Sequence, residues 1–375
     1  MSGNIVIFRE GLLLILALLL SACSPAWQDA RRFLNDLARG ADAESPREML
    51  AYAIGEHRYL GDLYRPAGLP QAGVVLVPGV AEQGRDDPRL MSFAGALARS
   101  GFLVLVPEIG TLRELKVRPD DARSVSDAFL YLRSRPELHK SCRTGIVAFS
   151  YATGPAVLAA MQPELQDEVD FVLAVGGYFD LPAVVTYLTT GHVREGAAWV
   201  RRSPNRYGKW VFVFGNLDRL ERADDRRQLE WIARDRLAHG GEVPEGLALG
   251  DEGRAVLALL TNQAPQRVAG LMAALPRGVR EDISALDLAN KDMSQLRSHM
   301  ILVHGTDDDL IPSEQSVALA SALPSGQAEL FLVDGLAHVD LRPEGLDSIQ
   351  LLRAVRALME QREPCHRPDG KRPVQ

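Results

Sequence analysis

The sequence contains none of the short patterns that hold a metal ion or a nucleotide phosphate. There is no Cys-x-x-Cys pair, no His-Glu-x-x-His motif and no calcium-loop pattern among its 375 residues, and such patterns mark many zinc and calcium sites. A glycine-rich phosphate loop is also missing. We therefore expect neither a metal ion nor a cofactor.

Aromatic side chains and clustered positive charge are scarce as well. Aromatic residues make up 6% of the chain, and the formal net charge is −7. The arginines are spread along the sequence, with no long basic run that could follow a phosphate backbone. These features argue against nucleic acid as a partner and against a broad aromatic platform for a polysaccharide.

Cysteine is rare, with only Cys23, Cys142 and Cys365 present. In an exported protein Cys142 and Cys365 could form a disulfide, but their spacing does not show whether they lie close together in the fold. Their pairing is left open by the sequence.

The chain does have enough apolar material for a large core. Hydrophobic residues make up 46% of its 375 residues, which is typical of a globular protein. The length fits one large domain with a sizeable insertion.

Ser150 stands between two segments of different character. The residues before it, 145–149, form a short apolar run typical of a buried strand, and those after it, 151–161, are typical of a helix. A serine on such a sharp turn presents its hydroxyl at the carboxyl end of a parallel sheet, where the helix N-terminus favours negative charge. The alternative is that Ser150 only caps the helix.

A serine nucleophile also needs a base and an orienting acid. Two later segments supply such groups after apolar runs. Residues 301–312 contain His304, Gly305 and Asp308, and residues 332–338 end in His338.

The order Ser, Asp, His, each at a strand end, resembles the α/β-hydrolase superfamily over residues 50–360. The resemblance implies Ser150 as the nucleophile, His338 as the base and Asp308, three residues after Gly305, as the acid. In the usual G-x-S-x-G turn the glycines relieve crowding, and here Ala148 and Ala152 stand in their places.

Two other carboxylates are rivals for the acid. Asp180 ends the segment after the next apolar run, where some members of the superfamily place their acid, and Asp218 has the same Gly-x-x-Asp spacing as Asp308. His304 is interpreted as structural. Tyr178 is either a pocket residue or a plain core residue.

The tetrahedral intermediate of acyl transfer needs two backbone N–H donors. By the same resemblance, one is Tyr151, directly after the nucleophile. The other is Val80, after Pro78 and Gly79, where the superfamily more often has His-Gly.

Apolar runs alternate with amphipathic segments through most of the chain, which predicts a parallel sheet covered by helices on both faces. The fold class we expect is α/β, with the mostly parallel central sheet of an α/β-hydrolase flanked by helices and an inserted helical cap. The expected strands are residues 57–65, 73–80, 102–107, 145–149, 171–175, 299–303 and 329–333. The expected helices are residues 90–99, 120–133, 151–161 and 346–361.

Residues 182–296 interrupt this alternation. They contain one apolar run, 210–214, and otherwise have helical character with proline and glycine between the segments. Insertions at this point of the superfamily usually form a cap that shapes the substrate site and excludes water. The alternative is an embellishment away from the site.

The N-terminus has the features of an export signal. Ten apolar residues, 11–20, follow Arg9 and lead into Leu20-Ser21-Ala22-Cys23. The run is too short to span a bilayer as a helix. The segment resembles the lipobox of bacterial lipoproteins, which implies cleavage before Cys23 and lipid on its thiol. Alternatives are an ordinary secretory signal or a buried element. Ser24 favours the outer membrane.

The predicted organisation follows from these segments. It comprises a lipoprotein signal peptide (1–22), a tether (23–49), a hydrolase core (50–181 and 297–361), a helical cap (182–296) and a polar tail (362–375).

The function implied is a serine hydrolase of the carboxylesterase, lipase or thioesterase kind, anchored by an N-terminal lipid to the bacterial envelope and facing the periplasm. Its partners would be a small acyl-ester substrate and the membrane. The alternatives are an acyltransferase on the same triad and an inactive hydrolase scaffold that binds a ligand. The acyl group, the leaving group and the oligomeric state stay open.

Overall fold

The computed structural model describes residues 25–39, 47–244, 246–338 and 348–362. Its strands are β1 (Arg47–Ile54), β2 (His57–Tyr64), β3 (Ala72–Val77), β4 (Phe102–Pro107), β5 (Thr144–Phe149), β6 (Phe171–Val175), β7 (His192–Glu195), β8 (Ala198–Arg201), β9 (His299–Gly305) and β10 (Ala328–Val333). Its α-helices are α2 (Pro25–Ala38), α3 (Pro88–Arg99), α4 (Gly110–Arg113), α5 (Asp121–Arg133), α6 (Thr153–Ala160), α7 (Leu181–Thr190), α8 (Arg206–Asn216), α9 (Ala223–His239), α10 (Asp251–Thr261), α11 (Val268–Ala273), α12 (Arg277–Leu286), α13 (Glu314–Ala322) and α14 (Ser348–Met359).

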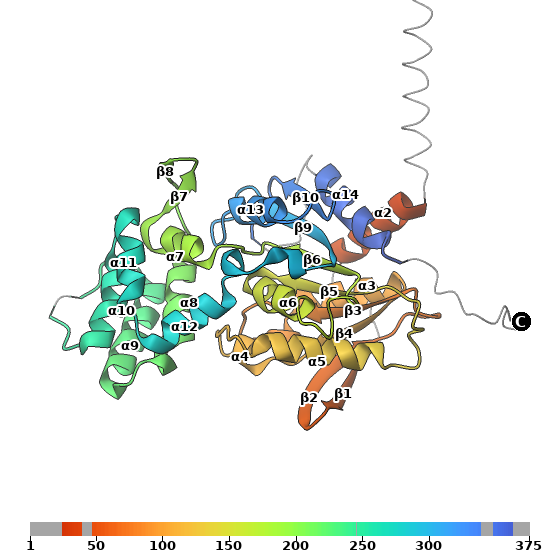
Figure 1. Ribbon diagram of the computed structural model, residues 1–375, viewed down its shortest axis with the longest axis horizontal. Helices are drawn as coiled ribbons and strands as arrows, with labels where there is room; N and C mark the ends of the chain where they lie inside the picture. The colour runs from red at the N-terminus through yellow and green to blue at the C-terminus, as the bar shows by residue number, and fades with distance from the viewer. Residues whose placement is uncertain (1–24, 40–46, 245, 339–347, 363–375) are drawn as a thin grey trace, which may run out of the picture.

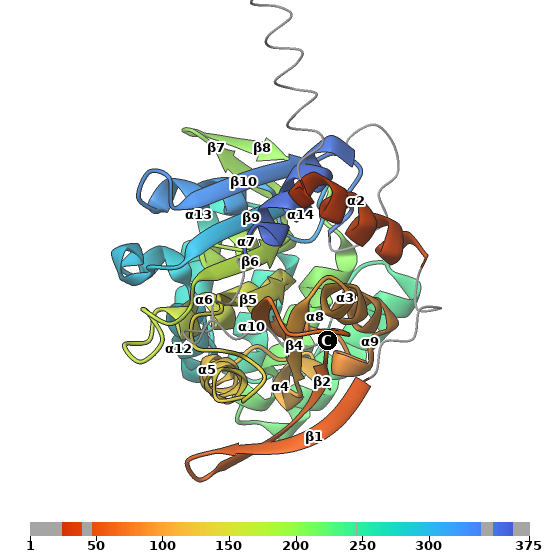
Figure 2. The same ribbon diagram turned by 90° about the vertical axis from the view of Figure 1, so that its right-hand side faces the viewer.

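The central sheet has the strand order β1-β2-β4-β3-β5-β6-β9-β10. The pairs β1–β2 and β2–β4 are antiparallel, and every other neighbouring pair is parallel. The twisted sheet crosses the molecule from β1 at one edge to β10 at the other (Figure 2). The predicted mostly parallel sheet flanked by helices is therefore confirmed.

Strands in the middle of the sheet are apolar along their whole length because helices cover both faces. In β3, Val75 and Val77 point to one core cluster, which also holds side chains of α5, α6 and α13. Val74 and Leu76 point to the opposite face of the sheet, into the other cluster, which holds side chains of α2, α3 and α14. All six residues of β3, β4 and β5 are buried.

Within the segment expected as a tether, 23–49, the structure has helix α2. Helix α2 packs on the core, with Phe33 fully buried and its ring edge-on to that of Phe93 at 5.4 Å between centroids. Arg99 of α3 also binds Asp36 at 2.6 Å. Figure 2 shows α2 beside α14 and α3. The segment also contains the first residues of β1, an edge strand whose only buried residue is Tyr52.

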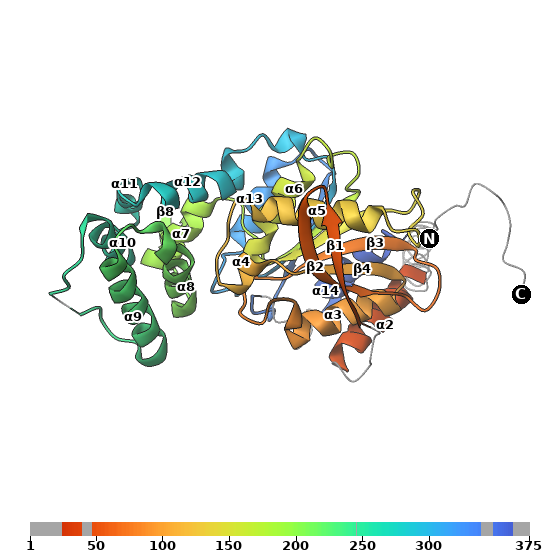
Figure 3. The same cartoon turned by 90° about the horizontal axis from the view of Figure 1, so that it is seen from below.

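Between β6 and β9 the chain forms a lobe of helices α7 to α12 with the β7–β8 hairpin. The lobe has a hydrophobic cluster of its own, which includes Trp210 and Val213 of α8 and Ile232 of α9. The apolar run at 210–214 is thus part of a helix. Figures 1 and 3 show this lobe beyond one end of the sheet, opposite α2.

The predicted signal peptide and lipidation site lie outside the described residues, as does most of the polar tail. Among the residues that the structure does describe, no helix is both long and apolar enough to cross a membrane. Cys142 is disulfide-bonded. Cys23 and Cys365 are not described.

Candidate active site

Ser150 lies on the tight turn that follows β5. It begins a short 3₁₀ turn, η3 (Ser150–Ala152), which leads into α6. Its φ is 56°, in the left-handed region that residues other than glycine rarely adopt. Ala148 and Ala152 are fully buried in the core, so the turn accommodates both methyl groups that replace the superfamily's glycines.

The turn brings Ser150 to His338, which lies 188 residues further along the chain. Ser150 Oγ is 2.9 Å from His338 Nε2, and His338 Nδ1 is 2.7 Å from Asp308 Oδ2. His338 also has a positive φ, 47°. The structure therefore brings together the three residues that the sequence assigns as nucleophile, base and acid.

The Asp308 carboxylate is held by two backbone N–H groups and two histidine side chains. Its Oδ1 accepts hydrogen bonds from the N–H groups of Leu310 and Ile311 at 2.8 and 2.9 Å. Burial alone would raise the pKa of this carboxyl. Hydrogen bonds to the two histidine side chains, His304 and His338, with a contribution from the Ile311 N–H, outweigh burial and hold the pKa below its usual range. Asp308 is therefore ionised at neutral pH.

An ionised Asp308 fixes the tautomer of His338. A carboxylate only accepts hydrogen bonds, so His338 Nδ1 must carry the proton. In the neutral imidazole, Nε2 is then unprotonated, and its lone pair accepts a hydrogen bond from the Ser150 hydroxyl. This arrangement matches that of a general base poised to take the serine proton.

His304 helps to hold the side chain of Asp308 in position. It is fully buried; its Nε2 lies 2.8 Å from the Ile311 carbonyl oxygen, to which it donates, and its Nδ1 lies 2.6 Å from Ser316 Oγ. His304 Nε2 is also 3.4 Å from Asp308 Oδ2. Its contacts are those of a positioning residue, in line with the structural role expected for it.

Two glycines allow the loops of the site to approach one another. A Cβ atom on Gly305 would lie 1.6 Å from the carbonyl oxygen of Leu336. Only glycine therefore fits at the end of β9, where the strand lies against the loop that leads to His338. Gly176, directly after β6, has a φ of +61°, and a Cβ atom there would lie 3.4 Å from both Asp308 Oδ2 and the His338 carbonyl oxygen. Close backbone contact thus aligns the acid with the base.

The two rival carboxylates have other partners. Asp180 Oδ1 accepts from the backbone N–H of Ala183 at 2.8 Å and caps α7. Asp218 forms ion pairs with Arg118 at 2.7 Å and Lys116 at 3.4 Å. The carboxylate hydrogen-bonded to His338 is that of Asp308.

A cavity of about 370 Å³ lies over Ser150 and His338. Val80 and Tyr151, which the resemblance assigns as oxyanion donors, line it. Tyr207, Gly208 and Val211 of α8 form another wall. These α8 residues carry no sequence signal for a site, because their position over Ser150 depends on how the lobe folds back on the core.

A second, smaller cavity of about 80 Å³ opens beside the first. It lies between the core and the lobe, and its walls are mostly apolar. The two cavities share Val80, Tyr151, Gly208 and Val211. Tyr178, which the sequence left as a pocket or core residue, lines the smaller cavity.

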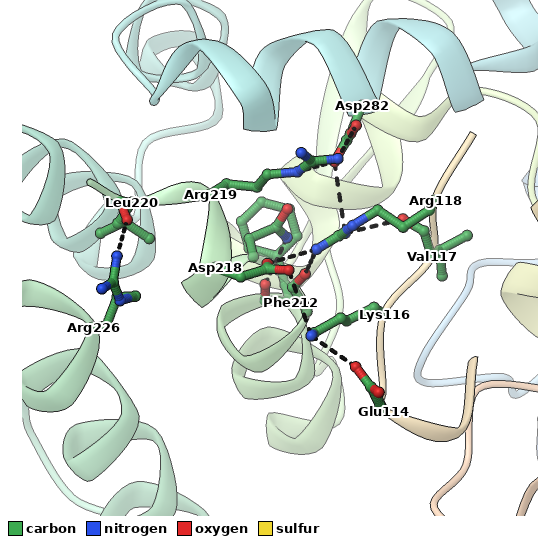
Figure 4. Close-up of polar contacts among 12 residues, drawn as sticks. Glu114, Lys116, Val117, Arg118, Phe212, Asp218, Arg219, Leu220, Arg226 and Asp282 are labelled. Carbon is green, nitrogen blue, oxygen red and sulfur yellow. Dashed lines mark hydrogen bonds and ion pairs between the residues drawn. The ribbon is translucent and has the colours of Figure 1, made fainter. Parts of the chain in front are cut away.

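The core and the lobe are joined by charged side chains (Figure 4). Arg118, on the loop before α5, contacts Asp218 at 2.7 Å and Asp282 of α12 at 3.6 Å. It also donates to the Gly215 carbonyl oxygen at 2.7 Å. Arg219 binds both oxygens of Asp282, at 2.8 and 2.9 Å. We call this cluster the cap junction.

No residue of the described chain is placed in a metal site. Among the described residues, no three His, Cys, Asp or Glu side chains are grouped so that they could hold a metal ion.

The sheet, the strained serine turn and the order Ser, Asp, His along the chain are those of the α/β-hydrolases. The chain has an α/β-hydrolase fold.

Comparisons with known proteins found matches among solved structures alone. No family model and no curated protein matches the sequence. Among solved structures, acylaminoacyl peptidase from Pyrococcus horikoshii is 12% identical, with a TM-score of 0.46; the match covers 85% of this chain and 41% of that one. The present chain thus spans about two fifths of that peptidase.

Two further structures match over most of their length. Dienelactone hydrolase from Anabaena variabilis is 15% identical, with a TM-score of 0.44 and coverage of 84% of this chain and 97% of that one. The 2,6-dihydroxy-pseudo-oxynicotine hydrolase is 12% identical, with a TM-score of 0.48 and coverage of 86% and 70%. At such identities the fold assignment rests on the strand order and turn of the present chain.

Proposed function

We propose that the protein is a serine hydrolase that cleaves an ester, a thioester or a small amide through an acyl-enzyme on Ser150. The observation that carries this proposal is the hydrogen-bonded series Ser150, His338 and Asp308 at the floor of a cavity. A serine that merely capped a helix would need neither the histidine nor the buried carboxylate.

The reaction follows from the geometry. His338 Nε2 takes the hydroxyl proton as Ser150 Oγ attacks the carbonyl carbon, and Asp308 stabilises the imidazolium that forms. Backbone N–H groups of Val80 and Tyr151 would bind the oxyanion. His338 then gives its proton to the leaving group. Water, deprotonated by the same histidine, attacks the acyl-enzyme and releases the acid.

A fluorophosphonate probe tests the nucleophile directly, because it bonds only to an activated serine. We expect the wild type to be labelled and Ser150→Ala to remain unlabelled. Ser124→Ala, a helix α5 serine outside the site, is the control and should be labelled like the wild type. Labelling of the Ser150→Ala variant would end the assignment, and failure to label the wild type would favour an inactive binding scaffold.

Product analysis separates a hydrolase from an acyltransferase on the same triad. The wild type is incubated with a p-nitrophenyl ester, with and without an added alcohol. A hydrolase forms the free acid in both cases. If the acylated alcohol dominates when the alcohol is present, the acceptor is the alcohol rather than water.

We further propose that the chain is cleaved before Cys23 and that lipid on the Cys23 thiol anchors the protein to the bacterial envelope, in the outer membrane facing the periplasm. Support comes from the sequence before Cys23 and from the disulfide bond of Cys142, which suits an oxidising compartment. Helix α2 begins two residues after Cys23 and is packed on the core. The membrane and the core would therefore be close.

In this arrangement the active site faces away from the anchor, since α2 and the lobe lie at opposite ends of the molecule (Figures 1 and 3). Metabolic labelling with a palmitate analogue and mass spectrometry of the N-terminal peptide test the anchor. We expect label in the wild type and none in Cys23→Ser. An unlabelled wild type, cleaved elsewhere and released, would instead be an ordinary secreted protein.

A further inference from the structure

The apolar cavity beside the catalytic one has no role in the reaction as derived above. Its walls come from both parts of the molecule, including Tyr178 from the core and Val185 and Leu286 from the lobe. Because it shares Tyr151 and Val80 with the catalytic cavity, it opens next to the nucleophile and the proposed oxyanion donors. Whatever is attached to the reacting carbonyl carbon can extend into it.

Helix α8 forms a wall of both cavities, which share its residues Gly208 and Val211. Gly208, Val211, Phe212 and Gly215 all line the apolar cavity, and their spacing of three, four and seven residues places them on one helix face. Gly215 lets the helix approach the core, because a Cβ there would lie 2.9 Å from the carbonyl oxygen of Leu115.

Gly208 lines both cavities, and there is little room for a side chain at this position. A Cβ there would lie 2.7 Å from a methyl carbon of Leu188 and 3.0 Å from one of Leu310. Leu188 lines the apolar cavity and Leu310 lines the catalytic cavity. Both atoms are the ends of flexible side chains, so an alanine would push the leucines toward the cavities and reduce the space for a ligand.

The charged side chains that line the apolar cavity are paired with charges of opposite sign. Arg118 and Asp282 line it, and they belong to the cap junction (Figure 4). Counting the neighbours paired with them, three cations (Lys116, Arg118, Arg219) face three carboxylates (Glu114, Asp218, Asp282). No unmatched charge is left to bind an ionic group, which favours an uncharged, apolar ligand.

The volume sets the length of that ligand. A cavity of 150 Å³ lined by apolar side chains holds benzene, with six carbons, so the roughly 80 Å³ here has room for about three. With the carbonyl carbon and its neighbours at Ser150, the complete acyl chain has about four to six carbons.

We propose that the apolar cavity binds the acyl chain of an uncharged ester of about four to six carbons, and that Gly208 keeps the passage to it open. This inference rests on the proposed hydrolase function. Each methylene buried in the cavity should raise kcat/KM about fourfold. The rise should run from acetate to about hexanoate and then level off or reverse, because the cavity is full.

The test is kcat/KM for p-nitrophenyl esters from acetate to decanoate, measured on the wild type and two variants. In Gly208→Ala the ratio of hexanoate to acetate should fall by at least tenfold, because the displaced leucines narrow the passage. In Phe212→Ala the optimum should move to longer chains, because the cavity is deeper. The control is Gly270→Ala, the same substitution in exposed helix α11 of the lobe, where a Cβ meets nothing within 4 Å. It should keep the wild-type profile.

The outcomes separate the two proposals. If esters are hydrolysed in a Ser150-dependent way but neither variant changes the chain-length profile, the acyl chain lies elsewhere and this inference is overturned, while the hydrolase stands. A Phe212→Ala optimum at shorter chains would also overturn it. If no ester is hydrolysed and the fluorophosphonate does not label Ser150, the hydrolase proposal itself fails. Should Gly208→Ala not fold, Phe212→Ala alone decides.

Discussion

The catalytic turn and the cap junction are held in place by different kinds of interaction. At the catalytic turn, backbone N–H groups, two histidine side chains and the close approach of loops hold the triad. Asp308 is fixed by two N–H groups, and Gly305 and Gly176 permit close passage of neighbouring loops. At the cap junction charged side chains span the gap, with Arg118 reaching carboxylates on two elements of the lobe.

Both regions contain strained backbone. The residues other than glycine with positive φ in the described chain are Leu115, Ser150 and His338. Two of them are in the triad, and Leu115 adjoins the cap junction and lines the apolar cavity. Such strain persists only where surrounding contacts over-determine it. The comparison suggests that close packing of loops holds the triad, whereas charged side chains add to the apolar contacts through which α7 of the lobe joins the core.

The largest effect should follow from removing the nucleophile. Ser150→Ala should lower kcat by about a million-fold, leaving only the contribution of binding and the oxyanion donors. The measurement is single-turnover hydrolysis of p-nitrophenyl butyrate, with circular dichroism to show that the fold is intact. A variant within tenfold of the wild type would mean that another group attacks the carbonyl.

The acid should come next. Asp308→Asn should leave the backbone contacts largely in place but favour the wrong tautomer of His338, lowering kcat by about 10⁴-fold. The matched control is Asp180→Asn, which changes a helix cap and should alter stability by less than about 1 kcal/mol with little change in rate. The reverse pattern would place the acid on the earlier strand.

The cap junction should affect stability more than chemistry. Arg118→Met removes the bonds to Asp218 and to the Gly215 carbonyl oxygen, whereas Asp282 keeps both bonds to Arg219. Losing hydrogen bonds from a charged group in this way typically costs about 1–3 kcal/mol. We expect a lower free energy of unfolding in urea and a raised KM, with kcat changed much less than in Asp308→Asn. Arg277→Met, at an exposed pair with Glu281, is the control and should be near neutral.

Equal stabilities of Arg118→Met and Arg277→Met would show that the lobe is held by its apolar contacts instead. A fall in kcat as large as that of Asp308→Asn would show that the junction also sets the triad geometry.

The last effect concerns pH, and it contrasts two buried carboxyls. Burial raises the pKa of Asp121, beside the Arg118 backbone, to about 6. A pKa higher in the folded state than in the unfolded state means that this group's contribution to stability is fully present below about pH 4 and is lost as pH rises through 6. The difference from the ordinary 3.8 corresponds to about 3 kcal/mol.

Asp308 has the opposite sign, since its pKa is depressed in the folded state. Its contribution is present above about pH 4 and is lost only in stronger acid. Urea unfolding of the wild type and Asp121→Asn between pH 4 and 7 isolates the Asp121 effect, and the variant should lose less stability as pH rises. Parallel curves for the two proteins would contradict the raised pKa.

Several elements could be predicted because their signals are local. The apolar runs at 102–107 and 171–175 coincide with β4 and β6. Buried parallel strands carry such runs because both faces are covered. Strand β1 gave no such run, because it lies at the sheet edge and buries one residue. The sequence did not show that α2 packs on the core, because only contact with α3 and α14 shows that Phe33 is buried.

The sequence by itself determined the order of the candidate catalytic residues along the chain: a serine after one strand, an acid three residues beyond Gly305 and a histidine after a later strand. These signals are local because each depends on a strand end and a tight turn. The tertiary structure alone decided that His338 binds Asp308 rather than Asp180 or Asp218, that α8 roofs the site, and that Arg118 joins the lobe to the core. These contacts link residues up to 188 positions apart, and they depend on packing between whole elements, which no short pattern of residues encodes.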